Sequence, residues 1–298
     1  MTSGRDASGQ HTSKEIRDEL KDELRREVEE PGSEEAEKLR IRSEWISACS
    51  FLPMTESEIF KEISERIRSA LAAKERPVVL LDLDSTLYEV GPRSFGILQE
   101  WLSHADSAPY PVIRERLSRL REEDIGYSLK DTFRTLGLSL EDQQNFHAWE
   151  SAKQFWMNRF FTSEYLKKFD RPYPGAARFT QEIHRLGAEV VYLTGRDEPG
   201  MGAGTRECLL RDGFPWDQER THLLLKAAFD RSDLGHKTSA ARFIRDLGRL
   251  VASFENEPAN LVALYDLFPD AMHVFVETLA SDRGARPIAG LYRVRHFE

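Results

Sequence analysis

The sequence has few of the residues that cross-link or anchor a protein. Its only cysteines are Cys49 and Cys208, and it contains no Cys-x-x-Cys pair and no Cys/His cluster. Neither a zinc site nor a disulfide framework is therefore indicated. The longest apolar runs, such as residues 78–81, are far too short to span a bilayer, and the N-terminus lacks the apolar segment of a secretory signal. We therefore expect no membrane-spanning segment and a cytoplasmic location.

An excess of positive charge is also missing. The 298 residues include 42 Lys and Arg against 51 Asp and Glu, which gives a net charge of −9 and a pI near 5.5. Nucleic-acid binding usually needs a basic face, so no nucleic-acid partner is expected. A small phosphorylated ligand needs only a local cationic pocket. The sequence does not indicate an oligomeric state.

Residues 1–40 differ from the rest in composition. They carry eight Lys or Arg and twelve Asp or Glu, with few large apolar side chains. We expect a charged tail that is solvated and disordered, because such a segment buries too little apolar surface to fold alone. Residues 15–30 could instead form an exposed helix with salt bridges along it, ended at Pro31-Gly32. Both interpretations remain open.

The rest of the chain indicates an α/β protein. Ile59, Ile63, Ile67 and Leu71 recur at helical spacing and predict one apolar helix face. Continuous aliphatic runs are typical of buried parallel strands, and they occur at residues 77–81, 189–193, 222–225, 250–254 and 272–276. Helical patterns lie between the later runs, at 204–212, 237–247 and 258–267. This alternation predicts a parallel sheet with helices on both faces.

One long interval interrupts that alternation. Between the first strand and the run at 189–193, the pattern is helical and rich in aromatic residues, with Ile113, Leu117 and Leu120 on one face. An insertion with its own apolar residues predicts a separate all-α module. We therefore divide the chain into a tail at 1–40, a core domain at 41–87 and 175–298, and a helical module at 88–174.

The strongest chemical signal is Asp82-Leu83-Asp84, directly after the first strand. Alternation along a strand turns both carboxylates to the same side, where they repel each other unless a cation or a shared proton intervenes. Ligands of open α/β sheets bind at this end of the strands. The pair suits phosphoryl transfer through an aspartyl-phosphate, with Asp82 as nucleophile, Asp84 as general acid and base, and Mg²⁺ as cofactor.

These residues resemble the first motif of the haloacid dehalogenase-like (HAD) hydrolases, which extends here through Ser85-Thr86-Leu87. The resemblance implies a Rossmann-like core, an aspartate nucleophile and Mg²⁺. Thr194-Gly195, which follows an apolar run, is similar to the family's second motif. There Thr194 would donate a hydrogen bond to a phosphoryl oxygen, aided by main-chain N–H groups near Gly195.

The resemblance also implies a lysine that neutralises the nucleophile and the phosphate. Lys237, at the start of the predicted helix 237–247, matches that position better than Lys226, which follows a strand. The alternative assignment to Lys226 stays open. Where the family usually has two acids, this sequence has Glu255-Asn256. The metal ligands implied are Asp82, Asp84 and one or both of Glu255 and Asn256, since carboxylate and amide oxygens both suit Mg²⁺.

The inserted module lies where the family's C1-type cap belongs, and Arg93 is near the junction of module and core. The resemblance thus implies a capped, Mg²⁺-dependent phosphatase acting on a small phosphomonoester. Asp84 argues against a halide-removing enzyme, because such enzymes lack that second acid. Two alternatives remain: a phosphoryl-transferring mutase, and a non-catalytic binding module with a degenerate metal site.

Overall fold

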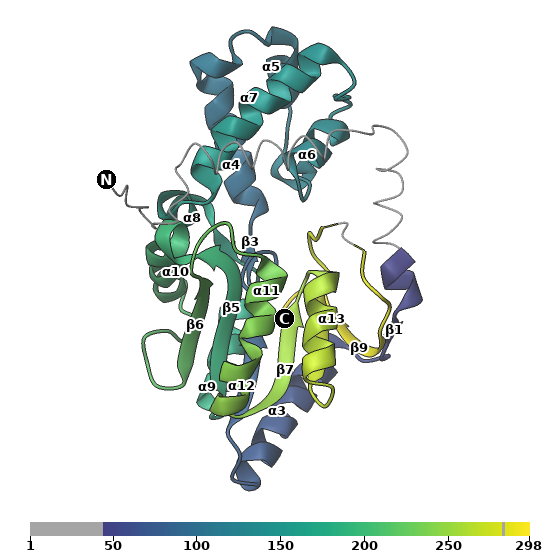
Figure 1. Ribbon diagram of the computed structural model, residues 1–298, viewed down its shortest axis with the longest axis vertical. Helices are drawn as coiled ribbons and strands as arrows, with labels where there is room; N and C mark the ends of the chain where they lie inside the picture. Colours follow the sequence, from purple (N-terminus) through teal and green to yellow (C-terminus); the bar gives the residue numbers. More distant parts are fainter. Residues whose placement is uncertain (1–43, 282–283) are drawn as a thin grey trace, which may run out of the picture.

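The computed structural model describes residues 44–281 and 284–298, so the predicted charged tail at 1–40 lies outside the described residues. A seven-stranded sheet forms the centre of the molecule, with strand order β1-β9-β8-β7-β2-β5-β6 and parallel pairing throughout (Figure 1). Its strands are β1 (Ser50–Phe51), β2 (Pro77–Leu81), β5 (Glu189–Asp197), β6 (Thr221–Lys226), β7 (Arg249–Glu255), β8 (Met272–Val276) and β9 (Ala289–Val294).

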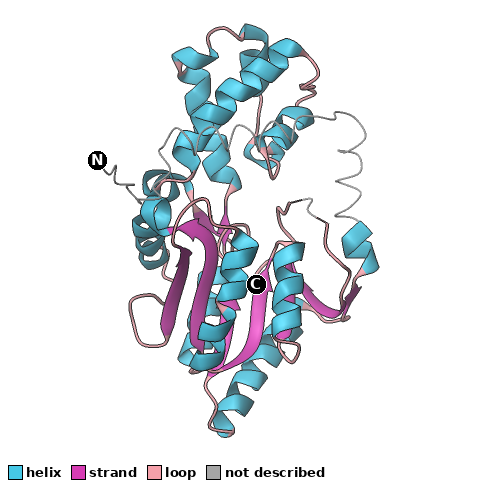
Figure 2. Ribbon diagram, in the orientation of Figure 1, coloured by secondary structure: helices cyan, strands magenta, loops and turns pink. Residues whose placement is uncertain are grey.

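Helices cover both faces of this sheet (Figure 2). One face carries α3 (Glu56–Ala72), α9 (Ala176–Arg185) and α10 (Glu198–Arg211), and the other carries α11 (Asp233–Ser239), α12 (Ala241–Leu247) and α13 (Pro258–Leu267). Strand alternation divides the apolar side chains between the two faces. In β2, Val79 and Leu81 belong to the cluster under α3, whereas Val78 and Leu80 pack with α12 and α13. The predicted α/β fold with helices on both faces is confirmed.

A helical module stands above the carboxyl edge of the sheet in Figure 1. It comprises α4 (Gly91–Ser103), α5 (Pro111–Leu117), α6 (Leu129–Thr135), α7 (Gln143–Phe160), α8 (Ser163–Phe169) and two short 3-10 turns, η1 (Ala105–Ser107) and η2 (Glu122–Asp124). The module has its own apolar core, to which the predicted face of Ile113, Leu117 and Leu120 contributes. A small antiparallel pair joins module and core, in which β3 (Tyr88–Glu89) lies beside β4 (Arg171–Pro172).

The five apolar runs all lie in strands of the sheet, and the residues of one predicted helix, 258–267, form α13. The predicted helix 204–212 is wrong at its start, because α10 already begins at Glu198. Asp197 caps that helix by accepting a hydrogen bond from the Gly200 N–H, and Pro199 occupies its first turn. Glycines at 200, 202 and 204 hide this start from a propensity argument, because glycine is a poor helix former.

Two further details of the sequence prediction are corrected. Lys237 does not start its helix: Ser232 accepts a hydrogen bond from the Gly235 N–H, so α11 begins at Asp233 and the helical stretch is interrupted at Ala240. Leu71 is 40% exposed, although Ile59, Ile63 and Ile67 are fully buried. Steps of four residues advance 40° per step beyond a full turn, so the fourth position has rotated off the buried face.

Across residues 44–281 and 284–298, no helix is both long and apolar enough to cross a membrane.

Candidate active site

Three neighbouring central strands bring the predicted site residues to one edge of the sheet. Asp82 directly follows β2 and continues its ladder, because its N–H donates to the Phe254 carbonyl at 3.1 Å. β5 carries Thr194, and β7 ends at Glu255. Since β2 pairs in parallel with both neighbours, their carboxyl ends meet at this edge. The side chains of Asp82, Thr194 and Glu255 are all buried there.

The segment after Asp84 forms a tight turn that leads the chain out of the sheet. The Leu83 carbonyl accepts hydrogen bonds from the N–H groups of Thr86, Leu87 and Tyr88. Ser85 has a φ of 59°, in the left-handed region that side chains other than glycine seldom adopt. The strain is localised next to the candidate catalytic pair, and the surrounding hydrogen bonds hold the turn in place.

Lys237 lies between two carboxylates. Its Nζ atom donates to Asp82 Oδ1 at 2.7 Å and to Glu255 Oε2 at 2.6 Å, and the lysine is 3% exposed. Burial alone would lower the pKa of Lys237, but the charges of Asp82 and Glu255 outweigh it and hold that pKa above its ordinary value. The ammonium therefore stays charged and links the candidate nucleophile to the end of β7.

Asp82 and Glu255 both contact this ammonium, so the pocket has an excess of negative charge whenever both carboxyl groups are ionised. Burial raises the pKa of Asp82 above its usual value, although Lys237 and the Thr86 hydroxyl pull in the opposite direction. Burial likewise raises the pKa of Glu255 to about 8 against the attraction of Lys237, and the negative charge of Asp82 adds to the rise. A second cation at this point would relieve the imbalance.

Two arginines hold the carboxylate of Asp84. Arg196 Nε donates to Oδ2 at 2.9 Å, and the Nη2 atoms of Arg196 and Arg93 both donate to Oδ1 at 2.9 Å. Both arginine side chains are fully buried, whereas the Asp84 side chain is 32% exposed. Burial would raise the pKa of Asp84, but the Arg196 and Arg93 guanidiniums outweigh it and hold that pKa far below its usual range. Asp84 is therefore a carboxylate in this arrangement.

Asn256 is oriented by two hydrogen bonds. Its Oδ1 atom accepts from the Thr86 hydroxyl at 3.1 Å, and its Nδ2 atom donates to the Leu279 carbonyl at 2.6 Å. The side chain is buried, and its amide oxygen is directed toward the turn after Asp84. A carboxylate in its place would direct a second oxygen at the Leu279 carbonyl. The amide therefore satisfies both partners, which explains why Asn is accommodated at this position.

The structure separates the two lysine candidates. Lys226 Nζ donates to the carbonyls of Phe229 and Arg231 and forms an ion pair with Asp233 at 2.8 Å, so its contacts are with the loop after β6 and the first residue of α11. Lys237, in contrast, contacts Asp82 directly. At Gly195 an added Cβ atom would lie 2.9 Å from the Asp233 carboxylate, so a larger residue there would require the Asp233 side chain to move.

The donor set is suited to Mg²⁺ in its chemistry. Within the described part of the chain, no cluster of three or more His, Cys, Asp and Glu side chains forms a ready-made metal site. The candidate oxygens are instead those of the Asp82 and Glu255 carboxylates, which both contact Lys237, and that of the Asn256 amide, which accepts a hydrogen bond from Thr86. Mg²⁺ prefers oxygen ligands and is often held by only one or two carboxylates. When both are ionised, Asp82 and Glu255 carry one charge more than Lys237 neutralises, so the residues fit a divalent cation.

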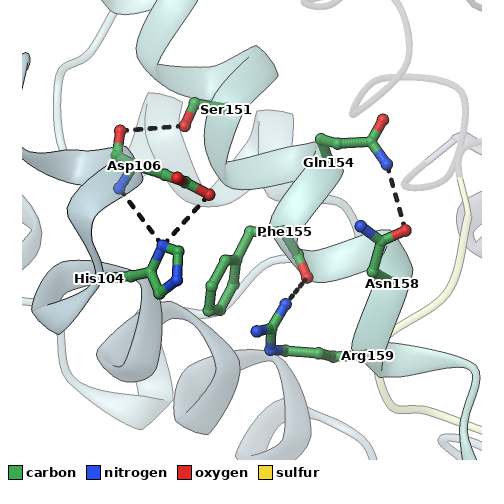
Figure 3. A pocket seen from close by; sticks show the side chains of 7 residues that line it. All are labelled: His104, Asp106, Ser151, Gln154, Phe155, Asn158 and Arg159. Carbon is green, nitrogen blue, oxygen red and sulfur yellow. Dashed lines mark hydrogen bonds and ion pairs between the residues drawn. The ribbon is translucent and has the colours of Figure 1, made fainter.

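A separate hollow lies within the helical module (Figure 3). It has a volume of about 260 Å³, and the Asp106 carbonyl accepts a hydrogen bond from the Ser151 hydroxyl at its wall. Arg159 stacks over the Phe155 ring, with its guanidinium carbon 3.4 Å from the ring centre. The lining consists entirely of module residues, namely His104, Asp106, Ser151, Gln154, Phe155, Asn158 and Arg159. None of the predicted site residues belongs to it.

The sequence prediction missed part of the site's surroundings. Asp170, at the end of α8, contacts both arginines that hold Asp84, but an isolated acid among charged neighbours gives no signal in the sequence. Arg196 could have been found, because a charged residue immediately after Thr194-Gly195 at the end of a buried strand is unusual. Thr86 lies inside the first motif, and its contact with Asn256 joins two motifs that are distant in the sequence.

A model of the haloacid dehalogenase-like hydrolase family matches residues 77–224, which include β2, the helical module and β5. The chain therefore belongs to the haloacid dehalogenase-like hydrolases. No curated protein matches it.

Several solved structures are similar in fold. A HAD-superfamily hydrolase of subfamily IA from Geobacter sulfurreducens is 13% identical, with a TM-score of 0.45 and coverage of 74% of this chain and 92% of that one. A predicted phosphatase from Clostridium acetobutylicum is 14% identical, with a TM-score of 0.41 and coverage of 72% and 94%. Protein Tyrosine Kinase A from Mycobacterium tuberculosis is 14% identical, with a TM-score of 0.44 and coverage of 74% and 94%. Similarities this distant say nothing about the reaction.

Proposed function

We propose that this hydrolase cleaves a small phosphomonoester into an alcohol and inorganic phosphate, with Asp82 as the nucleophile. The observation that carries the proposal is the position of Asp82, a buried carboxylate at the carboxyl end of the central strand, with the Lys237 ammonium 2.7 Å away. That ammonium lies where an incoming phosphate would otherwise meet only negative charge. The Thr194 hydroxyl and the N–H of Gly195, on the neighbouring strand, would bind phosphoryl oxygens.

The reaction takes place in two displacements. In the first, the oxygen of Asp82 not held by Lys237 attacks phosphorus, the bond from phosphorus to the ester oxygen breaks, and the departing oxygen takes up a proton. In the second, water attacks the aspartyl-phosphate, the bond from phosphorus to Asp82 breaks, and phosphate leaves. Asp82 is restored, and the water's proton is taken up by a base.

Asp84 is the residue that would transfer these protons. Both arginines hold it as a carboxylate, which is the form that accepts a proton from the attacking water. Donation to the departing oxygen requires a protonated Asp84, so at least one guanidinium contact has to be released before that step. The accessibility of its side chain, 32% exposed, allows contact with substrate and water.

Mg²⁺ would be held by the carboxylate of Asp82, the main-chain carbonyl of Asp84 and an oxygen of Glu255 or Asn256. When bound, the ion supplies positive charge that offsets the repulsion between Asp82 and the substrate phosphate.

The test is turnover of p-nitrophenyl phosphate with and without Mg²⁺, in the wild-type chain and in Asp82→Asn. We expect Mg²⁺-dependent release of phosphate and a fall of about three orders of magnitude or more in the variant. An Asp82→Asn variant that is as active as the wild type would refute the mechanism. Turnover without Mg²⁺ would show that the metal has no part in the mechanism.

Two other activities give different outcomes in the same experiment. A mutase would return the phosphate on a second position of the same molecule, which phosphorus NMR of the products distinguishes from free phosphate. A binding module is favoured by one observation, the neutral Asn256 at a position where the family usually has an acid. It predicts no turnover over a panel of phosphorylated metabolites, with binding of inorganic phosphate retained.

A further inference from the structure

Four charged side chains meet where the helical module joins the core. Arg196 and Asp84 form one two-point pair, in which Nε and Nη2 of the arginine donate to the two carboxylate oxygens, each at 2.9 Å. Arg93 and Asp170 form a second pair of the same kind, with both distances at 2.7 Å. We call these residues the arginine–aspartate network. Two arginines balance two carboxylates, so the network carries no net charge.

Hydrogen bonds also join the two pairs to each other. Arg93 Nη2 also donates to Asp84 Oδ1 at 2.9 Å, and Arg196 Nη2 also donates to Asp170 Oδ2 at 2.8 Å. Arg93 is held further by the Phe160 carbonyl and by the Phe160 ring, whose centre is 4.3 Å from the guanidinium carbon. Apart from Asp84, these charged side chains are fully buried. Because water is largely excluded from this site, such paired contacts hold the side chains in a fixed geometry.

The four residues of the network come from two different parts of the molecule. Asp84 and Arg196 belong to the core, since one follows β2 and the other lies in β5. Arg93 and Asp170 belong to the module, since one lies in the first turn of α4 and the other ends α8. They lie on the two segments by which the chain leaves the core and returns to it.

We propose that Arg93, Arg196 and Asp170 are positioning residues that fix the carboxylate of Asp84, so that the place of the helical module determines the place of Asp84. The proposal rests on the proposed function for its kinetic consequence and on the contacts above for its structural one. Asp170 acts at one remove, because it contacts the arginines and not Asp84. None of the three contacts substrate in this role.

The first test compares Arg93→Lys with the wild type. Lysine keeps the positive charge but lacks the planar fork needed for paired contacts with two carboxylates. A catalytic group displaced by about 1 Å loses about 100-fold in rate, so we expect kcat to fall by about 10- to 100-fold while KM stays within about threefold. Arg171→Lys is the matched control, because Arg171 is adjacent to Asp170 but is exposed and paired with Glu89 and Glu122. Its kcat should match the wild type.

Two further measurements distinguish the positioning role from a purely structural one. In an Asp84→Asn background, Arg93→Lys should lower kcat less than twofold, because its effect acts through Asp84; a further tenfold loss overturns the proposal. Crystal structures of the wild type and Arg93→Lys give a readout that needs no turnover. We expect the Asp84 carboxylate to shift by about 1 Å or to change rotamer. An unmoved Asp84, or an unchanged kcat, overturns the proposal.

Asp170→Asn serves if Arg93→Lys does not fold, because it loosens Arg93 without changing a group that touches Asp84. The same fall in kcat with a nearly unchanged KM is expected, together with the same shift of the Asp84 carboxylate. The outcomes of the two proposals stay distinct. A wild-type chain without phosphatase activity refutes the proposed function, while the position of Asp84 in the two variants still decides the positioning role.

Discussion

Removal of the buried ammonium should affect both activity and stability, and Lys237→Met is the substitution that tests this. Methionine has a similar length but no charge, so Asp82 and Glu255 would face each other without a counter-ion. Lys237 is 3% exposed and Glu255 1% exposed, so solvent cannot take its place. Breaking a buried ion pair by deleting one partner costs about 3–5 kcal/mol. For a core of this size that corresponds to a fall in Tm of about 6–20 °C.

The pH dependence of this defect has a definite sign. Without the ammonium, the pKa values of Asp82 and Glu255 rise further above their values in the unfolded chain. Groups with a raised pKa in the folded state contribute stability that is present at low pH and lost as the pH rises. The defect should therefore grow as the pH rises above about 8, the pKa of Glu255 in the wild type, because the variant keeps this group protonated where the wild type ionises it. Urea unfolding of variant and wild type at one pH below and one pH above this value measures it.

Lys226→Met is the matched control for this prediction. Lys226 contacts two loop carbonyls and Asp233, whose side chain is 50% exposed and stays hydrated when its partner is lost. The cost should be about 1–2 kcal/mol, with kcat close to that of the wild type. If Lys237→Met unfolds like the wild type at both pH values, or if Lys226→Met is the more damaging substitution, the charge assignment of the pocket is wrong.

Three further predictions concern single residues. Asn256→Asp should lower stability in the absence of metal by about 1–3 kcal/mol, since a carboxylate oxygen would face the Leu279 carbonyl at 2.6 Å. It should also reduce the Mg²⁺ concentration for half-maximal activity, and an unchanged Mg²⁺ titration would exclude Asn256 as a ligand. Gly204→Ala should cost about 1–3 kcal/mol in urea unfolding, because the added Cβ would lie 2.6 Å from the Ser163 main chain; a neutral effect would show that α8 and α10 can separate freely. Burial lowers the pKa of His273 below 6.5, so the unfolded chain takes up the proton first and stability should fall as the pH drops below about 6.5. His273→Gln should flatten that part of the profile, and an equal slope in both proteins contradicts the assignment.

The central strands were predictable because nearly every residue in them is apolar or buried, so most positions indicate the same structure. The continuous aliphatic run of β2 is buried at every position, and so are the residues of β8. Such runs predict a strand that is covered on both faces of the sheet, even when the neighbouring strands are unknown. β9 was not predicted, because its first two residues are exposed and include a glycine. Its place in the sheet depends on pairing with β8, which is a tertiary contact and leaves no local pattern.

The site was predictable as far as strand ends determine it. Asp82, Thr194 and Glu255 follow or end neighbouring strands, so their meeting follows from the parallel topology. The contact of Lys237 with Asp82 required more, because Lys237 lies inside α11, not at its start. Lysine has a long side chain, and this reach compensates for a helix that begins earlier than the sequence suggests.

The environment of Asp84 could not be predicted from the first motif alone. The motif gives two carboxylates on one side of a strand end, and their mutual repulsion suggests a metal or a shared proton. The structure places Arg93 and Arg196 there instead, and they neutralise Asp84 with side chains from α4 and β5. These contacts join residues that are distant in sequence, so no spacing rule reveals them.

The central position of β2 has a consequence for how the chain folds during synthesis. β2 pairs with β5 and β7, and residues 82–188 must be made before the first of these partners begins. At about 5–20 residues per second, that takes about 5 to 20 s. The helical module, whose core is formed by residues of a single continuous segment, can fold within that interval on a much shorter timescale. During this time the apolar strand that leads to Asp82 has no partner and is open to aggregation. Expression at low temperature or with added chaperones should therefore affect the yield of this chain more than its final stability.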